Sequence, residues 1–267
     1  MGLIVFSIGG IPVYLYGGIV MLAILAGILA AWLNVRLHGE DFAPMVDVLL
    51  AGLPAGLIMA RLGYVLGHWP SYAEHWSDIP CFWQGGLSLY GGMAGFLLVL
   101  WVYSRYFDMD IWYWLDLLVP ALILCLAIDQ VGRFASQMTV GMPLPHDLPN
   151  DHTLAEYIEY RYRPSGFENY EYFRPVALYQ AFLQLVVFVF AILLTFWQSQ
   201  RHFLVSGGIF LLSVVLLALV RCGCGFLYLT TAAGFSIHIG QIMSLLAAGA
   251  ALGVFAWRRR CRRDWRI

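Results

Sequence analysis

Seven apolar stretches recur along the chain, separated by several short polar connections and one long one. A helix needs roughly 20 consecutive apolar residues to cross the hydrocarbon core of a bilayer. Each stretch has about that length, so we predict an all-α fold, a polytopic membrane bundle of seven transmembrane helices. The predicted spans are residues 11–33, 45–67, 86–106, 111–132, 176–198, 204–228 and 234–256. The chain, residues 1–267, is then a single integral membrane domain.

The composition agrees with this prediction, because 61% of the residues are hydrophobic and 12% are charged. A soluble domain is typically about 25% charged. This high share of hydrophobic residues and low share of charged residues excludes a soluble globular domain. No nucleic-acid partner is expected. The five cysteines are odd in number and predict no disulfide framework. Cys222 and Cys224 lack a neighbouring histidine or acid and are weak evidence for a metal site. Neither a metal nor a cofactor is predicted.

The distribution of arginine predicts the orientation of the bundle. The chain contains no lysine, and its arginines gather in the short connections 34–44, 104–110 and 199–203 and after the last span. Positive residues in short loops stay cytoplasmic. The C-terminus is therefore predicted to be cytoplasmic, and seven spans then place the N-terminus outside. The long polar segment, about 134–175, becomes an extracytoplasmic loop region, with a short helix predicted from Thr153 to Arg163.

This orientation places several polar side chains in the outer third of the membrane. They are Arg61, Arg133, Arg174, Arg221, Tyr16, Tyr90 and His238, together with the glycine-rich helix start from Gly85 to Gly95. A helix N-terminus attracts anions, and the guanidinium fork matches phosphate geometry. An anionic phospholipid headgroup is the ligand expected at that depth. For the glycine stretch taken by itself, close helix packing by small residues is the favoured alternative.

Arg133 and Arg61 each have two competing interpretations, whereas Asp116 has a single one. Asp129 and Arg133 are four residues apart on one helix face, so Arg133 either pairs with Asp129 or faces a lipid phosphate. Arg61 is explained either by function or by snorkelling of its long side chain. Asp116, near the inner end of its helix, is predicted to be an ordinary interfacial acid.

Several motifs resemble those of one known family, the bacterial prolipoprotein diacylglyceryl transferases. The run from Gly85 to Gly92 is similar to that family's Gly-Gly-Leu-Ser-x-His-Gly-Gly signature. Further resemblances follow in the same order along the chain: Tyr14-Leu15-Tyr16-Gly17, Arg61-Leu62-Gly63-Tyr64, Gly132-Arg133, Arg174-Pro175 with Leu178-Tyr179, Arg221, and Gly240-Gln241-Ile242-Met243-Ser244. The resemblance covers nearly the whole chain.

The resemblance implies a multi-pass protein of the bacterial inner membrane that transfers diacylglyceryl from phosphatidylglycerol to a cysteine thiol. The acceptor is the lipobox cysteine of a preprolipoprotein, and glycerol phosphate is released. The implied catalytic residues are Tyr16, Tyr90, Arg133 and Arg221. The implied substrate-binding residues are Arg61, Gly85, Gly86, Ser88, Gly91, Gly92, Ser136, Arg174 and His238. The implied partners are phosphatidylglycerol or another anionic phospholipid and the lipobox peptide, and no metal is required.

The chain departs from the family pattern at several polar positions. Tyr90 replaces a histidine, Ser136 an asparagine, and Gly141, Gln180 and Gly225 each replace a glutamate. A phenol with a pKa near 10 is a poor base at neutral pH. One hypothesis is an active transferase in which Tyr16, Tyr90 or His238 replaces the lost base. The alternative is a catalytically lost or redirected homologue that binds anionic phospholipid or uses another acceptor.

Overall fold

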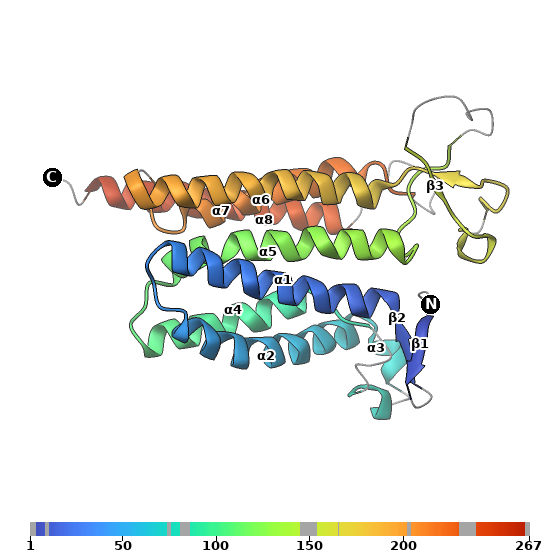
Figure 1. The fold of residues 1–267 in the computed structure, drawn as a ribbon, viewed down its shortest axis with the longest axis horizontal. Helices are drawn as coiled ribbons and strands as arrows, with labels where there is room; N and C mark the ends of the chain where they lie inside the picture. Colours follow the sequence, from blue (N-terminus) through green and yellow to red (C-terminus); the bar gives the residue numbers. More distant parts are fainter. Residues whose placement is uncertain are drawn as a thin grey trace. The chain divides into compact units, whose positions relative to one another are not determined.

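The computed structural model of the chain describes residues 4–8, 11–73, 76–80, 86–144, 154–164, 166–201, 204–229 and 239–264. Seven helices of 18 residues or more dominate it (Figure 1): α1 (Leu15–Leu37), α2 (Ala43–Gly67), α4 (Leu89–Tyr106), α5 (Ile111–Ala135), α6 (Val176–Arg201), α7 (Gly208–Gly225) and α8 (Ile239–Asp264). The all-α prediction is confirmed. Within the described ranges six of these helices, all except α4, are long and apolar enough to cross a membrane.

The remaining elements are short. They are the strands β1 (Ile4–Ile8), β2 (Ile11–Tyr14), β3 (Glu156–Tyr157) and β4 (Tyr172–Phe173), the helix α3 (Trp69–Tyr72) and 3-10 turns at Trp76–Asp78 and Tyr160–Tyr162. The first helix starts later than predicted, because residues 11–14 pair with β1 in an antiparallel hairpin. Pro12 lacks an N–H, and the β-branched residues around it favour an extended backbone.

The chain forms two compact units. The smaller unit comprises Val35–Trp114, and the larger unit comprises Met1–Asn34 with Leu115–Ile267. The smaller unit therefore contains α2, α3 and α4. The larger unit contains α1, most of α5, the helices α6 to α8 and the two strand pairs.

In the smaller unit, glycines of α4 lie directly on α2. A Cβ at Gly91 would collide with the backbone oxygen of Met59, and one at Gly95 would lie 2.7 Å from the oxygen of Ala55. Only glycine permits such a close approach of two helix backbones. Close packing, the alternative interpretation of the glycine-rich stretch, is therefore confirmed for these two positions.

In the larger unit, α1 and α5 also approach through glycine. A Cβ at Gly27 would collide with the sulfur of Cys125, and one at Gly132 would lie 2.9 Å from Cγ2 of Ile19. The Cys125 thiol donates a hydrogen bond to the carbonyl of Ala23 at 3.1 Å. Farther along, α5, α6 and α7 share an apolar core whose buried members include Val119, Ile123, Val187, Ala191 and Ile209. The α1–α5 contact fixes the side chains of both helices near Gly132.

Asp116 is not the interfacial acid that the sequence predicted. It is 6% exposed, and its two carboxylate oxygens accept hydrogen bonds from the backbone N–H groups of Gly207 and Phe210, each at 2.7 Å. Gly207 is the residue preceding α7, has a φ of 85° and offers no side-chain cap. Asp116 of α5 therefore supplies the N-terminal cap of a different helix, a role that local sequence does not reveal.

Replacing Asp116 by alanine is expected to destabilise the protein by about 2–4 kcal/mol, because two charge-assisted hydrogen bonds are lost and the first turn of α7 is left with unpaired N–H groups. Thermal unfolding of the detergent-solubilised variant measures this loss. Asp110→Ala is a matched control, since Asp110 caps the exposed start of α5 through the N–H of Trp112. That change is expected to cost only about 1 kcal/mol. Equal losses in the two variants would contradict the assignment.

The long polar segment, about 134–175, does not contain the predicted helix within its described residues. Instead β3 pairs with β4, placing Glu156 opposite Phe173, and a 3-10 turn follows at Tyr160–Tyr162. The Gln137 side chain, just beyond α5, donates to the carbonyl of Tyr157 and accepts from the N–H of Glu159. These long-range bonds outweigh the local helical pattern. Figure 1 shows this strand pair beyond the ends of α5 and α6.

Candidate functional site

Arg61 is enclosed within the smaller unit. It is 5% exposed, and its guanidinium donates to three backbone carbonyls: Asp78 at 2.6 Å, Ile79 at 2.8 Å and Gly86 at 3.2 Å. Its Cζ also lies 5.3 Å from the centre of the Tyr72 ring. A snorkelling side chain would extend toward water. Arg61 instead holds the segment that leads into α4.

Gly86 and Ser88 shape the start of α4 next to Arg61. Gly86 has a φ of 75°, and a Cβ there would lie 2.9 Å from the Arg61 guanidinium, so the position requires glycine. Ser88 is the N-cap residue, and its hydroxyl accepts from the N–H of Gly91 at 3.3 Å. Gly92 and Tyr90 lie in the first turn of α4, whereas Gly85 lies outside the described residues.

In the larger unit, one carboxylate joins two of the predicted catalytic residues. The Tyr16 hydroxyl donates to Oδ1 of Asp129 at 2.6 Å, and Nε of Arg133 donates to Oδ2 at 2.8 Å. Of the two alternatives that the sequence left open for Arg133, the structure shows the pairing with Asp129. The Arg133 side chain nevertheless remains 34% exposed, and its Cζ lies 6.0 Å from the centre of the Tyr16 ring. Arg133 can thus pair with Asp129 and still present its terminal N–H groups to an anion.

The glycine before Arg133 explains why this arrangement forms. A Cβ at Gly132 would press on Ile19 and lie 3.4 Å from Cδ2 of Tyr16. The first turn of α1 can therefore lie directly against the last turns of α5. Asp129 and Arg133, one helical turn apart, then both face the Tyr16 hydroxyl.

Arg221 lies near the end of α7 and packs on the start of α8. A Cβ at Gly240 would lie 3.3 Å from an Arg221 terminal nitrogen, so a larger residue there would displace the guanidinium. The next residue, Gln241, is 3% exposed, packs directly on Gly225 and donates to the carbonyl of Cys222 at 3.2 Å. His238, the other predicted residue of this corner, lies outside the described residues.

Tyr228, just beyond the end of α7, is a partly buried phenol that the sequence did not single out. Burial raises the pKa of its hydroxyl, and the nearby positive charges of Arg133 and Arg221 oppose that increase. The hydroxyl donates to Oε1 of the buried Gln180 at 3.0 Å. The signal available in the sequence was its position seven residues after Arg221, just past the end of the helix.

Two predicted binding residues flank this group without joining it. Ser136 is 2% exposed, and its hydroxyl has no partner among the described residues. Arg174 is exposed in the connection between β4 and α6, and its backbone N–H donates to the carbonyl of Met142 at 3.0 Å. In the described part of the larger unit, neither side chain forms a hydrogen bond or ion pair with Arg133 or Arg221.

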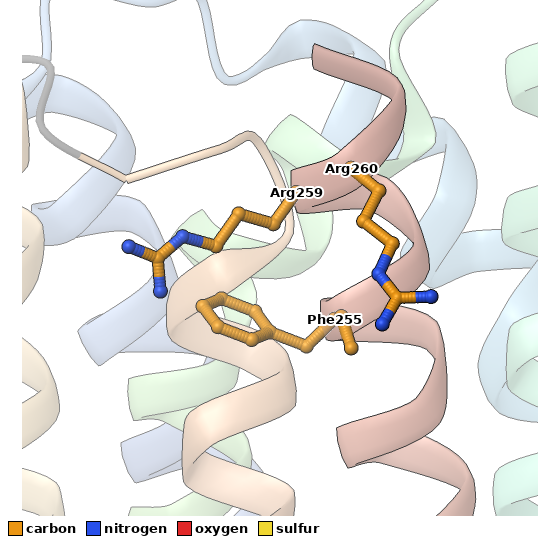
Figure 2. A pocket seen from close by; sticks show the side chains of 4 residues that line it. Phe255, Arg259 and Arg260 are labelled. Carbon is orange, nitrogen blue, oxygen red and sulfur yellow. The ribbon is translucent and has the colours of Figure 1, made fainter. Parts of the chain in front are cut away.

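A hollow lies at the other end of α8, lined by Phe255, Ala256, Arg259 and Arg260. Figure 2 shows the two guanidinium groups extending to opposite sides of the Phe255 ring. Two cations that diverge in this way do not converge on one anion. The hollow is therefore not a candidate site.

A sequence model of the prolipoprotein diacylglyceryl transferases matches residues 3–257, nearly the whole chain. The chain belongs to this transferase family. It is 33% identical over 210 residues to the phosphatidylglycerol–prolipoprotein diacylglyceryl transferase of Synechocystis sp., covering 78% of this chain and 71% of the relative. It is also 31% identical over 264 residues to the enzyme of that name from Enterococcus faecalis, covering 96% and 90%. With its apolar helices, this transferase-family member is a multi-pass bacterial membrane protein.

The structure of this transferase-family member accommodates its glycine substitutions locally. At Gly225, where the family has glutamate, the Gln241 side chain fills the space. At Gly141, the space for a side chain is closed by the carbonyl of Arg174 and by Cγ2 of Val176, the latter 2.7 Å from a Cβ. Gly141 also forms a bridge with Tyr228. Both glycines are therefore closely packed, and Gly141 lies beside Tyr228.

Glu156 is a further buried acid of this transferase, and the sequence did not single it out. It is 5% exposed, and both carboxylate oxygens lack partners among the described residues. Burial raises its pKa from 4.5 to about 7. The folded protein therefore binds a proton there more tightly than the unfolded chain.

The free energy of unfolding is expected to fall as the pH rises from about 4.5 to about 7. Above about pH 7 the contribution of Glu156 no longer changes with pH. The folded state keeps the Glu156 proton over that window while the unfolded chain has lost it, so ionisation penalises folding. The measurement compares melting temperatures of wild type and Glu156→Gln from pH 4 to pH 8. The advantage of the glutamine variant is expected to grow across the window. A constant difference between the two proteins would contradict the assignment.

Proposed function

We propose that this protein is an active phosphatidylglycerol–prolipoprotein diacylglyceryl transferase. It moves the diacylglyceryl group of phosphatidylglycerol to the thiol of a lipobox cysteine and releases glycerol phosphate. The family match over residues 3–257 gives the reaction class. The observation that supports retained chemistry is that Arg133 keeps a partly exposed guanidinium beside Tyr16 and Asp129, while Arg221 packs on Gly240 at the start of α8.

The reaction needs two kinds of assistance. The sulfur attacks the glycerol carbon that carries the phosphate ester, a carbon–sulfur bond forms and the carbon–oxygen bond breaks. The leaving phosphate gains one negative charge, and fixed cations in a site with little water stabilise that charge strongly. Arg133 and Arg221 are assigned this role. The thiol must also lose its proton, because the thiolate is the nucleophile.

The base and the remaining binding residues are proposals. Tyr16, Tyr90 and His238 are the candidates for the base in place of the family histidine. Arg174 is exposed and suits contact with a phosphate headgroup. The other proposed contributors to substrate binding are Arg61, Gly85, Gly86, Ser88, Gly91, Gly92, Ser136 and His238. Among these, Arg61 and Ser88 act by ordering the start of α4.

We further propose that α4 is a seventh span, so that the N-terminus is outside and the C-terminus is cytoplasmic. The arginines Arg258, Arg259 and Arg260 at the end of α8 support this orientation, because cations in short segments remain inside. The loop region 134–175 is then extracytoplasmic. Labelling of single cysteines with a membrane-impermeant reagent tests this. Labelling of residue 170 from the cytoplasmic side would contradict the orientation.

The deciding experiment uses purified protein, phosphatidylglycerol vesicles and a lipobox peptide. Release of glycerol phosphate together with a peptide thioether is the expected result. A catalytically lost or redirected homologue would release none, alongside a working relative as positive control. Rescue of a bacterial strain that lacks its own transferase provides an independent test in cells.

A further inference from the structure

Asp129 accepts a short hydrogen bond within the proposed catalytic group. Its Oδ1 lies 2.6 Å from the Tyr16 hydroxyl, and its Oδ2 lies 2.8 Å from Nε of Arg133. The carboxylate is 20% exposed, so its bonds are partly shielded from water. The two oxygens thus join the predicted catalytic phenol to the predicted catalytic guanidinium.

A tyrosine alone is a weak base, but a tyrosine bonded to a carboxylate can pass a proton on. When a donor gives its proton to the phenolic oxygen, the phenolic proton moves along the existing bond to the carboxylate. Neither oxygen needs to move, because the Tyr16–Asp129 bond is already formed. The close contact between α1 and α5 at Gly132 holds Tyr16 beside Asp129.

We propose that Asp129 is the proton acceptor for the attacking thiol and that Tyr16 relays the proton. The inference rests on the proposed transferase function and specifies its base. The thiol proton goes to the Tyr16 oxygen while the Tyr16 proton goes to Oδ1 of Asp129. The sulfur then uses its freed electron pair to form the carbon–sulfur bond, and the carbon–oxygen bond electrons leave with the phosphate.

This assignment couples the base to the leaving group through Arg133. Before the reaction, the negative Asp129 compensates the positive Arg133, and the lipid phosphodiester carries one negative charge. After proton transfer Asp129 is neutral, Arg133 is released from its ion pair, and the departing glycerol phosphate carries two negative charges. The total charge is unchanged. The cation becomes fully available when the phosphate charge develops, which is the condition for selective transition-state stabilisation. The Asp129 proton then passes to the released phosphate, which restores the starting state.

The test compares Asp129→Asn, Asp129→Glu, Tyr16→Phe and the double variant Tyr16→Phe/Asp129→Asn. Asp129→Asn is expected to lower kcat by roughly 100-fold or more, without raising KM for phosphatidylglycerol, because Arg133 stays available to the lipid. Asp129→Glu keeps a carboxylate and is expected to retain intermediate activity. The double variant is expected to be no slower than the slower single variant, since both changes interrupt one relay. Additive losses would overturn the proposal.

A selenocysteine lipobox peptide separates a base from a merely structural residue. A selenol is ionised at neutral pH and needs no base, so this peptide is expected to restore most of the rate of Asp129→Asn. It is not expected to rescue Arg221→Ala, which lacks charge stabilisation. Glu159→Gln is the matched control, because Glu159 is an exposed acid paired with Arg161 in the same unit. Failure of the selenocysteine peptide to rescue Asp129→Asn would overturn the inference.

A measurement that does not depend on activity distinguishes failure of the inference about Asp129 from failure of the proposed function. The infrared difference spectrum between wild type and Asp129→Asn at pH 7 is expected to show an ionised carboxylate. A protonated acid band would overturn the inference whether or not the protein transfers lipid. If Asp129 is ionised in the wild-type protein but no glycerol phosphate is released, the proposed function is overturned. The lipobox thiol is then not the donor of the proton either. Wild-type release with an unchanged Asp129→Asn rate would overturn the inference alone.

Discussion

Arg221→Ala is expected to reduce glycerol phosphate release by about 100-fold or more, because a preorganised cation that stabilises developing charge typically contributes at least that factor. Arg221 lies over Gly240 at the start of α8, and its charge acts on Tyr228 together with that of Arg133. The effect should fall mainly on kcat, since the phosphate gains charge only during bond cleavage. Steady-state kinetics with phosphatidylglycerol vesicles measures it.

Two further variants make this prediction specific. Arg221→Lys keeps the charge but loses the bidentate fork, so an intermediate rate is expected. Arg161→Ala removes a cation from the same unit, where Arg161 is 69% exposed and paired with Glu159, and is expected to leave the rate unchanged. Equal rates in Arg221→Ala and Arg161→Ala would contradict a catalytic role for Arg221. Size-exclusion profiles confirm that each variant is folded.

Gly141→Glu is expected to destabilise the fold by more than about 3 kcal/mol. A side chain at Gly141 would collide with the backbone carbonyl of Arg174, and backbone cannot move aside as a side chain can. It would also break the approach of this segment to Tyr228 and to residues 227–229. The yield of folded protein in detergent and its melting temperature measure the loss.

Position 225 provides the matched comparison. Gly225→Glu meets the flexible end of Gln241 rather than backbone, so a smaller cost of about 1–3 kcal/mol is expected. Adding Gln241→Ala vacates the space and should recover most of that stability. If the Gly141→Glu protein were as stable as wild type, the lack of room for a side chain at position 141 would be contradicted.

The sequence predicted the helices well, because each was specified by a long apolar run that the bilayer requires. The sequence also offered the Asp129–Arg133 pair as one of two alternatives, since two residues four apart on a helix are neighbours, but only the structure shows that the pair forms. The predicted helix from Thr153 was wrong in its described part. The deciding bonds there come from Gln137, about 20 residues earlier in the chain.

The candidate site was less predictable for the same reason. Nothing in the local sequence shows that Asp129 accepts a bond from Tyr16, 113 residues away, or that Tyr228 bonds Gln180, 48 residues away. Each glutamate loss was visible in the sequence, but its structural compensation was not. Gln241 fills the space at Gly225 from a different helix, which only packing could reveal.

The cap that Asp116 provides for α7 also fixes an order of assembly. Asp116 is synthesised 91 residues before Gly207, an interval of roughly 5–20 s at ordinary rates of translation. During that interval the carboxylate lacks the backbone N–H groups of Gly207 and Phe210. Completion of α7 satisfies Asp116 and the first turn of α7 in one event. The joining of α5 and α7 is thereby a late, cooperative step in the maturation of the protein.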